Sequence, residues 1–287
     1  MKIAIIIVCI VALLCLWGFL ETRFFIMHHY EYKSKKIPKS FDNAKMLYLV
    51  DLHNVHYGKF NTRLKKSVEK ANPDYVLIGG DFLSKNDDTY DSAIDLITWL
   101  CSKYPVYFVN GNHETKMKLY PEDYKGIYKE FYEMAKGVKC NCLSNQKVFI
   151  TRGDDKIVLD CLEISLDHYG MRDRKDLREE DIKRALGKVD KRFFNLMLAH
   201  SPRYLDAYSE WGADLVLSGH NHGGLARIPG VCGVISTEAR LFPKYTKGFY
   251  YKGDTTMLVS AGIGGHTLPI RFFNLPEALI ITLKKED

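Results

Sequence analysis

The chain has 287 residues, of which 46% are hydrophobic and 26% are charged, a composition ordinary for a globular protein that can bury a full core. The net charge of +6 is modest, and no long block of lysine and arginine is interleaved with aromatic residues, which argues against a dedicated nucleic-acid-binding protein. This mild basic excess suits an anionic substrate or a lipid surface.

Residues 1–22 are predicted to form a single transmembrane anchor. Ile3–Leu20 is an 18-residue stretch without a charged or strongly polar side chain, near the lower limit for a helix that spans a bilayer. The alternative is a cleaved signal peptide, whose apolar core is usually shorter, roughly 7–15 residues, and precedes a small-x-small cleavage site. No such site occurs before Glu21. We therefore expect an uncleaved anchor, with interfacial aromatic residues at Trp17, Phe24, Phe25 and Tyr30.

The side of the membrane on which the rest of the chain lies is left open. Lysines and Arg23 after the apolar stretch favour a cytoplasmic location by the positive-inside rule, but a signal anchor with the opposite orientation is equally compatible. Cysteine does not decide between them, because the five cysteines outside the anchor show no disulfide-framework or metal-site spacing apart from Cys140-Asn141-Cys142. Residues 23–43 are polar, aromatic and lysine-rich, which predicts a juxtamembrane linker before one domain at 44–287.

In that domain, short apolar runs alternate with segments of helical periodicity. Strands are expected at residues 46–50, 75–78, 106–109, 157–166, 193–198, 215–218, 257–260 and 278–283. Helices are expected at residues 61–71, 92–101, 121–135 and 173–186. This alternation predicts a layered α/β fold with partly parallel sheets, in which ligands bind beyond the carboxyl ends of the strands.

Five of the apolar runs end in side chains that can bind metal. Because glycines adjoin several of these ends, the backbone can turn tightly there and let the side chains converge. Imidazole nitrogen mixed with carboxylate oxygen suits manganese, iron or zinc rather than calcium. The ends of the runs carry Asp51 and His53, Asp81, Asn112 and His113, His200, and His220 and His222.

The order of these blocks resembles the calcineurin-like metallophosphoesterase superfamily. The matching blocks are Asp51-x-His53, Gly80-Asp81, Gly111-Asn112-His113-Glu114, His200 and Gly219-His220-x-His222, and they cover residues 46–266. The resemblance implies a four-layer α/β/β/α sandwich of two mixed sheets with two divalent metal ions (manganese, iron or zinc) at one edge. It also implies that Asp51, His53 and His222 bind one metal, that Asn112, His200 and His220 bind the other, and that Asp81 bridges both.

The resemblance further implies phosphoester hydrolysis by attack of a metal-bridging hydroxide, with no phosphoenzyme. His113 resembles the family's catalytic histidine, which stabilises or protonates the leaving oxygen. Many relatives carry a second acid three residues after the bridging aspartate to orient this histidine, whereas this chain has Ser84, so Asp87 or Asp88 would have to substitute. The Asp-Arg-Gly continuation of protein Ser/Thr phosphatases is also absent, which argues against a protein phosphatase.

Within the superfamily, the N-terminal anchor, residues 219–224 and residues 264–277 resemble a bacterial membrane-associated branch of phosphodiesterases. Part of that branch hydrolyses the pyrophosphate of UDP-diacylglucosamine. We hypothesise that four apolar residues beside Arg271 admit an acyl chain or face the bilayer, although packing in the core is the simpler alternative. These residues are Leu268, Ile270, Phe272 and Phe273.

The remaining histidines and a basic cluster have plain interpretations. His28 and His29 suit the interfacial segment, His56 is either pocket-lining or exposed, and His168 and His266 are weaker candidates. The cluster of Arg172, Arg174, Lys175 and Arg178 is typical of a solvated helix start rather than of a phosphate clamp.

The sequence therefore predicts a membrane-anchored, dinuclear-metal-dependent phosphoesterase that cleaves a phosphodiester or a pyrophosphate, with lipid-linked substrates included in this class. The alternatives are a phosphomonoesterase and a non-catalytic membrane scaffold that keeps the fold. Substrate-binding residues and oligomeric partners are not indicated by the sequence.

Overall fold

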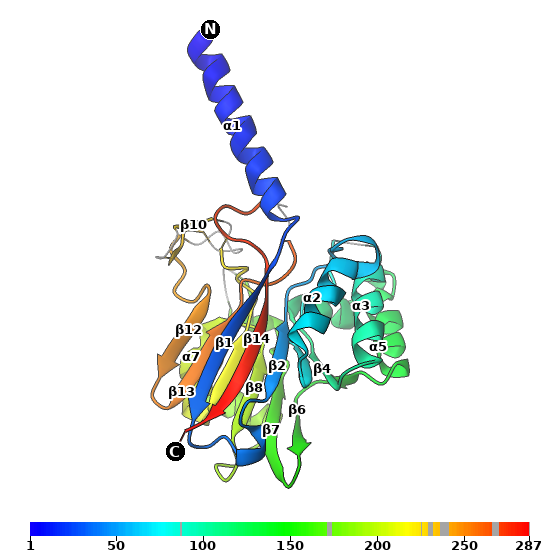
Figure 1. Cartoon of the computed structure of the whole chain (residues 1–287), viewed down its shortest axis with the longest axis vertical. Coiled ribbons are helices and arrows are strands. Elements are labelled where there is room, and N and C mark those ends of the chain that lie inside the picture. The colour runs from blue at the N-terminus through cyan, green and yellow to red at the C-terminus, as the bar shows by residue number, and fades with distance from the viewer. Residues whose placement is uncertain are drawn as a thin grey trace.

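A computed structural model describes residues 1–86, 88–170, 174–224, 226–228, 232–235, 241–265 and 270–286. Most of its strands form two six-stranded mixed sheets (Figure 1). The first sheet has the order β1 (Ile26–Ser34), β14 (Glu277–Lys285), β2 (Lys45–Leu49), β3 (Tyr75–Ile78), β4 (Val106–Val109) and β5 (Asn141–Leu143). The second has the order β12 (Gly248–Lys252), β13 (Thr255–Val259), β9 (Leu215–Ser218), β8 (Asn195–Ala199), β7 (Asp155–Leu162) and β6 (Gln146–Arg152). A separate two-stranded ribbon joins β10 (Arg227–Ile228) to β11 (Cys232–Gly233).

Helices cover the outer faces of both sheets. The α-helices are α1 (Lys2–Glu21), α2 (Thr62–Ala71), α3 (Asp91–Cys101), α4 (Asn112–Leu119), α5 (Ile127–Gly137), α6 (Glu179–Leu186) and α7 (Leu205–Trp211). Short 3-10 turns are η1 (Lys39–Phe41), η2 (Lys59–Asn61), η3 (Pro121–Tyr124), η4 (Leu166–His168) and η5 (Pro202–Tyr204). α1 alone projects away from the sandwich (Figure 1).

Successive side chains of the buried strands point to opposite faces of each sheet, and this alternation produces the layers. In β2, Leu47 and Leu49 face a cluster formed with helices α2, α3 and α5, whereas Met46 and Tyr48 face the second sheet. A third cluster lies between the second sheet and helices α6 and α7, around Trp211. Three apolar layers separated by two sheets confirm the predicted α/β/β/α sandwich.

The predicted linker at residues 23–43 differs from the structure. β1 lies inside this segment and pairs in parallel with β14, from Ile26 opposite Glu277 to Ser34 opposite Lys285. Of the nine β1 residues only Tyr32 is buried, so the strand lacks the apolar run on which the prediction relied. An edge strand can be this polar because one side of it faces solvent.

Several element boundaries also differ. The helix expected at residues 121–135 is split into η3 and α5, because Lys125 and Gly126 adopt left-handed backbone angles. The strand expected at residues 157–166 ends at Leu162, where β7 ends. The helix expected from Asp173 begins only at Glu179, and Asp173 itself lies outside the described residues. Helices α4 and α7 and strands β1, β5, β6 and β12 were not predicted.

Candidate metal centre

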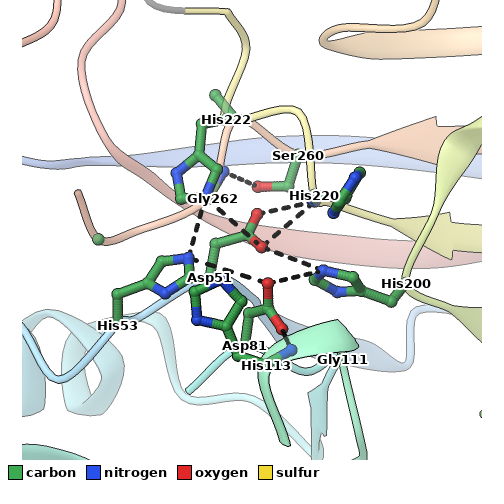
Figure 2. Close-up of polar contacts among 12 residues, drawn as sticks. Asp51, His53, Asp81, Gly111, His113, His200, His220, His222, Ser260 and Gly262 are labelled. Carbon is green, nitrogen blue, oxygen red and sulfur yellow. Dashed lines mark hydrogen bonds and ion pairs between the residues drawn. The ribbon is translucent and has the colours of Figure 1, made fainter. Parts of the chain in front are cut away.

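The side chains singled out at strand ends meet at one edge of the sandwich. β2, β3 and β4 run parallel in the first sheet, and β8 and β9 run parallel in the second. Their carboxyl ends therefore carry Asp51 and His53, Asp81, His113, His200, and His220 and His222 toward a common point (Figure 2). Three sets of donor atoms fall within 4.8 Å of one another: Asp51, His53 and His222; His53, Asp81 and His113; and Asp81, His200 and His220.

Asp81 and His53 lie between the other groups. The Asp81 Oδ2 atom is 3.1 Å from His200 Nε2 and 4.0 Å from His53 Nε2. His53 Nε2 is in turn 3.0 Å from His222 Nε2, which lies 3.9 Å from Asp51 Oδ1. Two imidazole nitrogens that face each other at this distance share either one proton or one cation, since each has only one lone pair or proton to offer there.

Strained backbone holds these side chains in place. Asp51, His53, Asp81, His220 and His222 all have positive φ, between 47° and 67°. Such residues are uncommon outside glycine and cluster at functional sites, where the surrounding structure compensates for the strain. The apolar runs were visible in the sequence, whereas these five left-handed residues were not.

Glycines make the close approach of the loops possible. A Cβ atom at Gly219 would lie 2.7 Å from Asp51 Oδ2, and one at Gly262 would lie 2.7 Å from the Asp51 Cβ atom. A Cβ at Gly111 would lie 2.2 Å from Asp81 Oδ1. Larger residues at these positions would push the carboxylates out of the centre.

The centre buries charge away from water. Asp51, Asp81 and His200 are at most 2% exposed. Burial, with Asp81 nearby, raises the pKa of Asp51 to about 7. Burial lowers the pKa of His200, but the carboxylates of Asp81 and Asp51 outweigh it and raise that pKa to about 10. Two buried carboxylates that keep a neighbouring imidazole protonated form a site that strongly attracts cations.

Backbone groups and further side chains orient the candidate ligands. His200 Nδ1 lies 2.8 Å from the Gly79 carbonyl, so the ring donates there and its Nε2 faces the carboxylates. Two amide groups hold the carboxylates: His220 N donates to Asp51 Oδ2 at 3.0 Å and His113 N donates to Asp81 Oδ1 at 2.8 Å.

Glu114 is a supporting residue for which the sequence motifs predicted no role. Its buried carboxylate accepts hydrogen bonds from the amides of Asp81, Leu83 and Gly111, at 2.8 to 2.9 Å. It therefore ties the loop after β3 to the loop after β4. Its position in the first turn of a helix, directly after His113, was the available signal.

His113 is held by a backbone amide. Its Nδ1 atom accepts a hydrogen bond from Lys85 N at 3.1 Å, which leaves the proton of the neutral ring on Nε2. Burial lowers the pKa of His113, which favours this neutral form. Asp88, one of the two predicted substitutes for the missing acid, instead pairs with Lys125 at the surface, at 2.7 Å. Asp87 lies outside the described residues.

The donor set fits divalent metal ions. Asn112 begins α4, and its Oδ1 atom is buried without a hydrogen-bond partner in the described part of the chain. A buried amide oxygen of this kind needs an electropositive partner. The clustered imidazoles and carboxylates are themselves the mixed nitrogen and oxygen ligands that manganese, iron and zinc accept.

Other candidate residues lie outside the centre. His28 pairs with Glu277 at 2.5 Å, His29 and His56 are exposed, and His168 Nδ1 lies 3.0 Å from the Lys175 carbonyl. His266 and Arg172 lie outside the described residues. In the basic cluster, Lys175 pairs with Asp167, and Arg174 donates to the Gly170 carbonyl.

The segment near Arg271 contacts both the centre and α1. Ile270 and Phe272 pack against Gly18 of α1, whereas Leu268 lies outside the described residues. Arg271 is buried, and its Nη2 atom lies 3.2 Å from His222 Nδ1 and 2.8 Å from the Ala261 carbonyl. This arginine stands out in the sequence, but its contact with a candidate ligand depends on the fold and has no local sequence signal.

Fold and site together define a metal-dependent hydrolase of phosphoric esters. The calcineurin-like phosphoesterase model matches residues 45–224, more than half of the chain, and the chain belongs to this family.

Relatives with similar sequences are also metallophosphoesterases by name. The uncharacterized metallophosphoesterase YkuE of Bacillus subtilis is 27% identical over 277 residues, covering 94% of this chain and 89% of that protein. A putative metallophosphoesterase of Caenorhabditis elegans is 29% identical, covering 88% of this chain and 52% of its own length. The transmembrane protein with metallophosphoesterase domain of Danio rerio is 28% identical, covering 88% and 55%. The chain thus spans about half the length of the two animal relatives.

Among solved structures, the chain is similar to phosphopantetheinyl hydrolase (PptH) from Mycobacterium tuberculosis. The TM-score is 0.46 and the sequence identity is 12%, over 79% of this chain and 90% of that one.

Proposed function

We propose that the chain is a membrane-anchored phosphodiesterase or pyrophosphatase that uses two divalent metal ions. The observation that carries this proposal is the position of Asp81 between two sets of buried donors. His53 lies on one side of the Asp81 carboxylate and His200 on the other, 4.0 Å and 3.1 Å away. A carboxylate placed in this way can serve two cations at once.

In this proposal, Asp51, His53 and His222 would hold one metal, Asn112, His200 and His220 would hold the other, and Asp81 would serve both. Two such ions would supply Lewis acidity and a water of lowered pKa for attack on phosphorus. The neutral Asn112 amide adds no negative charge, so the centre keeps a net attraction for the oxygens of a phosphoester.

We propose that His113 stabilises the leaving oxygen. The Lys85 amide occupies its Nδ1, so the Nε2 proton is the one available to a bound substrate. A neutral imidazole in this tautomer can donate a hydrogen bond to an oxygen that gains negative charge as the ester bond breaks. The Lys85 contact provides the orientation that an acid at the position of Ser84 would otherwise supply.

The membrane anchor supports a substrate near the lipid surface. α1 is long and apolar enough to cross a bilayer by length and composition. Two relatives, from Danio rerio and Bos taurus, are named transmembrane proteins with a metallophosphoesterase domain. We therefore include lipid-linked phosphodiesters and pyrophosphates in the proposed substrate class, with the domain on either side of the membrane.

The test is hydrolysis by the full chain in detergent micelles, after chelation and readdition of manganese, zinc or iron(II). Bis(p-nitrophenyl) phosphate and p-nitrophenyl phosphate are compared as diester and monoester. Metal-dependent turnover of the diester is the expected result, with Asp81→Asn as the inactive control. Preference for the monoester would indicate a phosphatase instead, and no turnover of either ester by a metal-loaded chain would favour the non-catalytic scaffold.

A further inference from the structure

The last turn of α1 is joined to the catalytic domain by a set of direct contacts. We call residues 270–274 the junction segment. Arg271 N donates to the Gly18 carbonyl at 3.0 Å. Both oxygens of Glu21 accept hydrogen bonds at 3.1 Å, one from Phe273 N and one from Asn274 N. The ring of Trp17 meets that of Phe273 edge to face, with centroids 4.6 Å apart.

These contacts fix the helix against the domain. A Cβ at Gly18 would lie 2.5 Å from Ile270 Cγ2 and 2.8 Å from Phe272 Cε1, so the two surfaces meet where the helix has no side chain. Gly18 and Glu21 are the buried residues of α1, and Glu21 is 9% exposed. A buried carboxylate that accepts two amide hydrogen bonds resists separation of the helix from the segment.

The length of the helix then determines where the domain lies. The 18 apolar residues of α1 rise about 27 Å, against a hydrocarbon core of about 30 Å. The helix therefore has no spare turn with which to hold the domain away from the bilayer. Its last turn, together with the Phe273 ring that contacts it, must lie at the boundary between lipid and water.

The end of the domain next to α1 exposes large apolar side chains. Phe24 is 56% exposed, Phe60 61%, and Phe273 53%. Leu241 and Phe242, which are 68% and 62% exposed, belong to the same end. Ala226 pairs with Phe272 in the junction segment, Val234 N donates to the Ala226 carbonyl, and Phe242 N donates to the Val234 carbonyl. Figure 1 shows β10 at the end of the domain from which α1 projects. A gathering of exposed rings at one end of a domain marks an interaction surface.

Cationic side chains cover the rings at this end. The Arg23 guanidinium lies 4.4 Å from the centroid of Phe19, Arg63 lies 5.8 Å from Phe24, and Lys59 Nζ lies 5.3 Å from Phe60. Arg63 also donates to the Arg23 carbonyl, which brings the start of α2 to the foot of α1. Aromatic rings with lysine and arginine beside them suit the headgroup layer of an anionic membrane.

We propose that this end of the domain is a bilayer-docking surface, formed by Phe24, Phe60, Leu241, Phe242 and Phe273 with Arg23, Lys59 and Arg63. The surface rests on anionic phospholipid headgroups, and its rings enter the interfacial layer. The domain is thus held on the membrane in one orientation instead of moving on a flexible linker. This inference rests on the proposed membrane anchor, but it does not depend on the proposed chemistry.

The orientation places the metal centre close to the lipid surface. The backbone of Arg271 contacts α1 and its side chain contacts His222. Asn274 Nδ2 donates to the His222 carbonyl at 2.7 Å, while its backbone amide binds Glu21. The junction segment therefore contacts both α1 at the docking surface and the candidate ligand His222.

The experiment uses the full chain reconstituted in vesicles of equal parts phosphatidylcholine and phosphatidylglycerol, with or without lipids brominated near the glycerol end of the acyl chains. Phe60→Trp adds an indole to the docking surface. Phe149→Trp is the matched control, because Phe149 is 52% exposed, lies beside the cation of Lys156 and belongs to β6. In each case the measured signal is the tryptophan emission added to that of the parent chain.

We expect brominated lipid to remove most of the emission added by Phe60→Trp and little of that added by Phe149→Trp. Adding Glu21→Ala to Phe60→Trp should restore a large part of the lost emission, because the domain is then free to tilt. Equal quenching of the two reporters in chains that float with the vesicles would overturn the docking surface. Failure of the parent chain to float with the vesicles would instead overturn the anchor on which the inference rests.

Discussion

At the scale of single residues, the orientation of His113 is the most informative feature of the centre. A ring that accepts a hydrogen bond at Nδ1 has one tautomer when neutral, and that tautomer presents a donor at Nε2. The amide of Lys85 thus imposes a proton position without adding charge. A carboxylate in its place would have raised the pKa of the imidazole and favoured the imidazolium form.

We predict that His113→Ala lowers turnover of the diester by about 10²- to 10⁴-fold, the range for removal of a general acid or base. The variant should keep its metal content, since the candidate ligands remain. Steady-state kinetics and elemental analysis on the same sample measure both quantities. Asp88→Asn is the control and should match the parent, because Asp88 pairs with Lys125 at the surface. Unchanged turnover in His113→Ala would contradict the assigned role.

At the scale of elements, β7 contains a buried carboxylate that the chemistry does not use. Asp160 is fully buried, and its oxygens make no hydrogen bond in the described part of the chain. By strand alternation it lies on the same face of β7 as Leu162, which packs with residues of α6 and α7. Lys147 on β6 lies opposite it, with Nζ 3.6 Å from Asp160 Oδ1. Burial raises the pKa of Asp160 to about 7, and Lys147 offsets only part of this effect.

This raised pKa predicts a loss of stability as the pH rises toward neutrality. The folded chain holds the Asp160 proton more tightly than the unfolded chain, so the free energy of unfolding falls as pH rises from about 4 to about 7. Asp160→Asn should remove that slope and be more stable than the parent at about pH 8, by on the order of 2–4 kcal/mol. Urea unfolding in a fixed detergent, followed across this range, measures the difference.

Asp155→Asn is the matched control, because Asp155 begins the same strand at the surface. The Ser40 amide lowers the pKa of Asp155, so this carboxylate is ionised throughout the range and its replacement should shift the curve without changing the slope. A parent slope that persisted in Asp160→Asn would show that another group titrates.

The strands and the candidate ligands show how much of the structure could be predicted from the sequence. Strands buried on both faces, such as residues 75–78, are continuous apolar runs, and the structure confirms β3 at those residues. β1 was missed because an edge strand needs few apolar residues and because its partner, β14, lies about 250 residues later in the chain. The candidate ligands could be grouped because parallel strands end at one edge. The positive φ angles, the contacts of Glu114 and the Lys85 amide depend on tertiary structure, so no local pattern revealed them.

At the scale of the whole molecule, the first and last parts of the chain form one structural unit around the centre. α1 precedes β1, the junction segment precedes β14, and β1 and β14 pair along their full length. Glu277, at the start of β14, accepts a hydrogen bond from the Ala261 amide next to Gly262, and Gly262 packs on Asp51. α1 is therefore connected to the candidate ligands through short, buried contacts.

This connection predicts that a substitution in α1 changes the metal affinity of the centre. In Glu21→Ala, the amides of Phe273 and Asn274 lose their acceptors, so Arg271 and Asn274 hold His222 less firmly. Removal of groups that orient a metal ligand weakens affinity by about 10- to 100-fold, and we expect about 10-fold here because Glu21 acts through one further residue. Metal retained after dialysis against a graded chelator measures the effect.

Glu21→Gln, which keeps one acceptor oxygen, should retain an amount of metal between that of Glu21→Ala and that of the parent. Glu31→Ala, on the exposed part of β1, should retain metal as the parent does. Equal retention in all four chains would mean that α1 is an independent tether with no part in forming the centre.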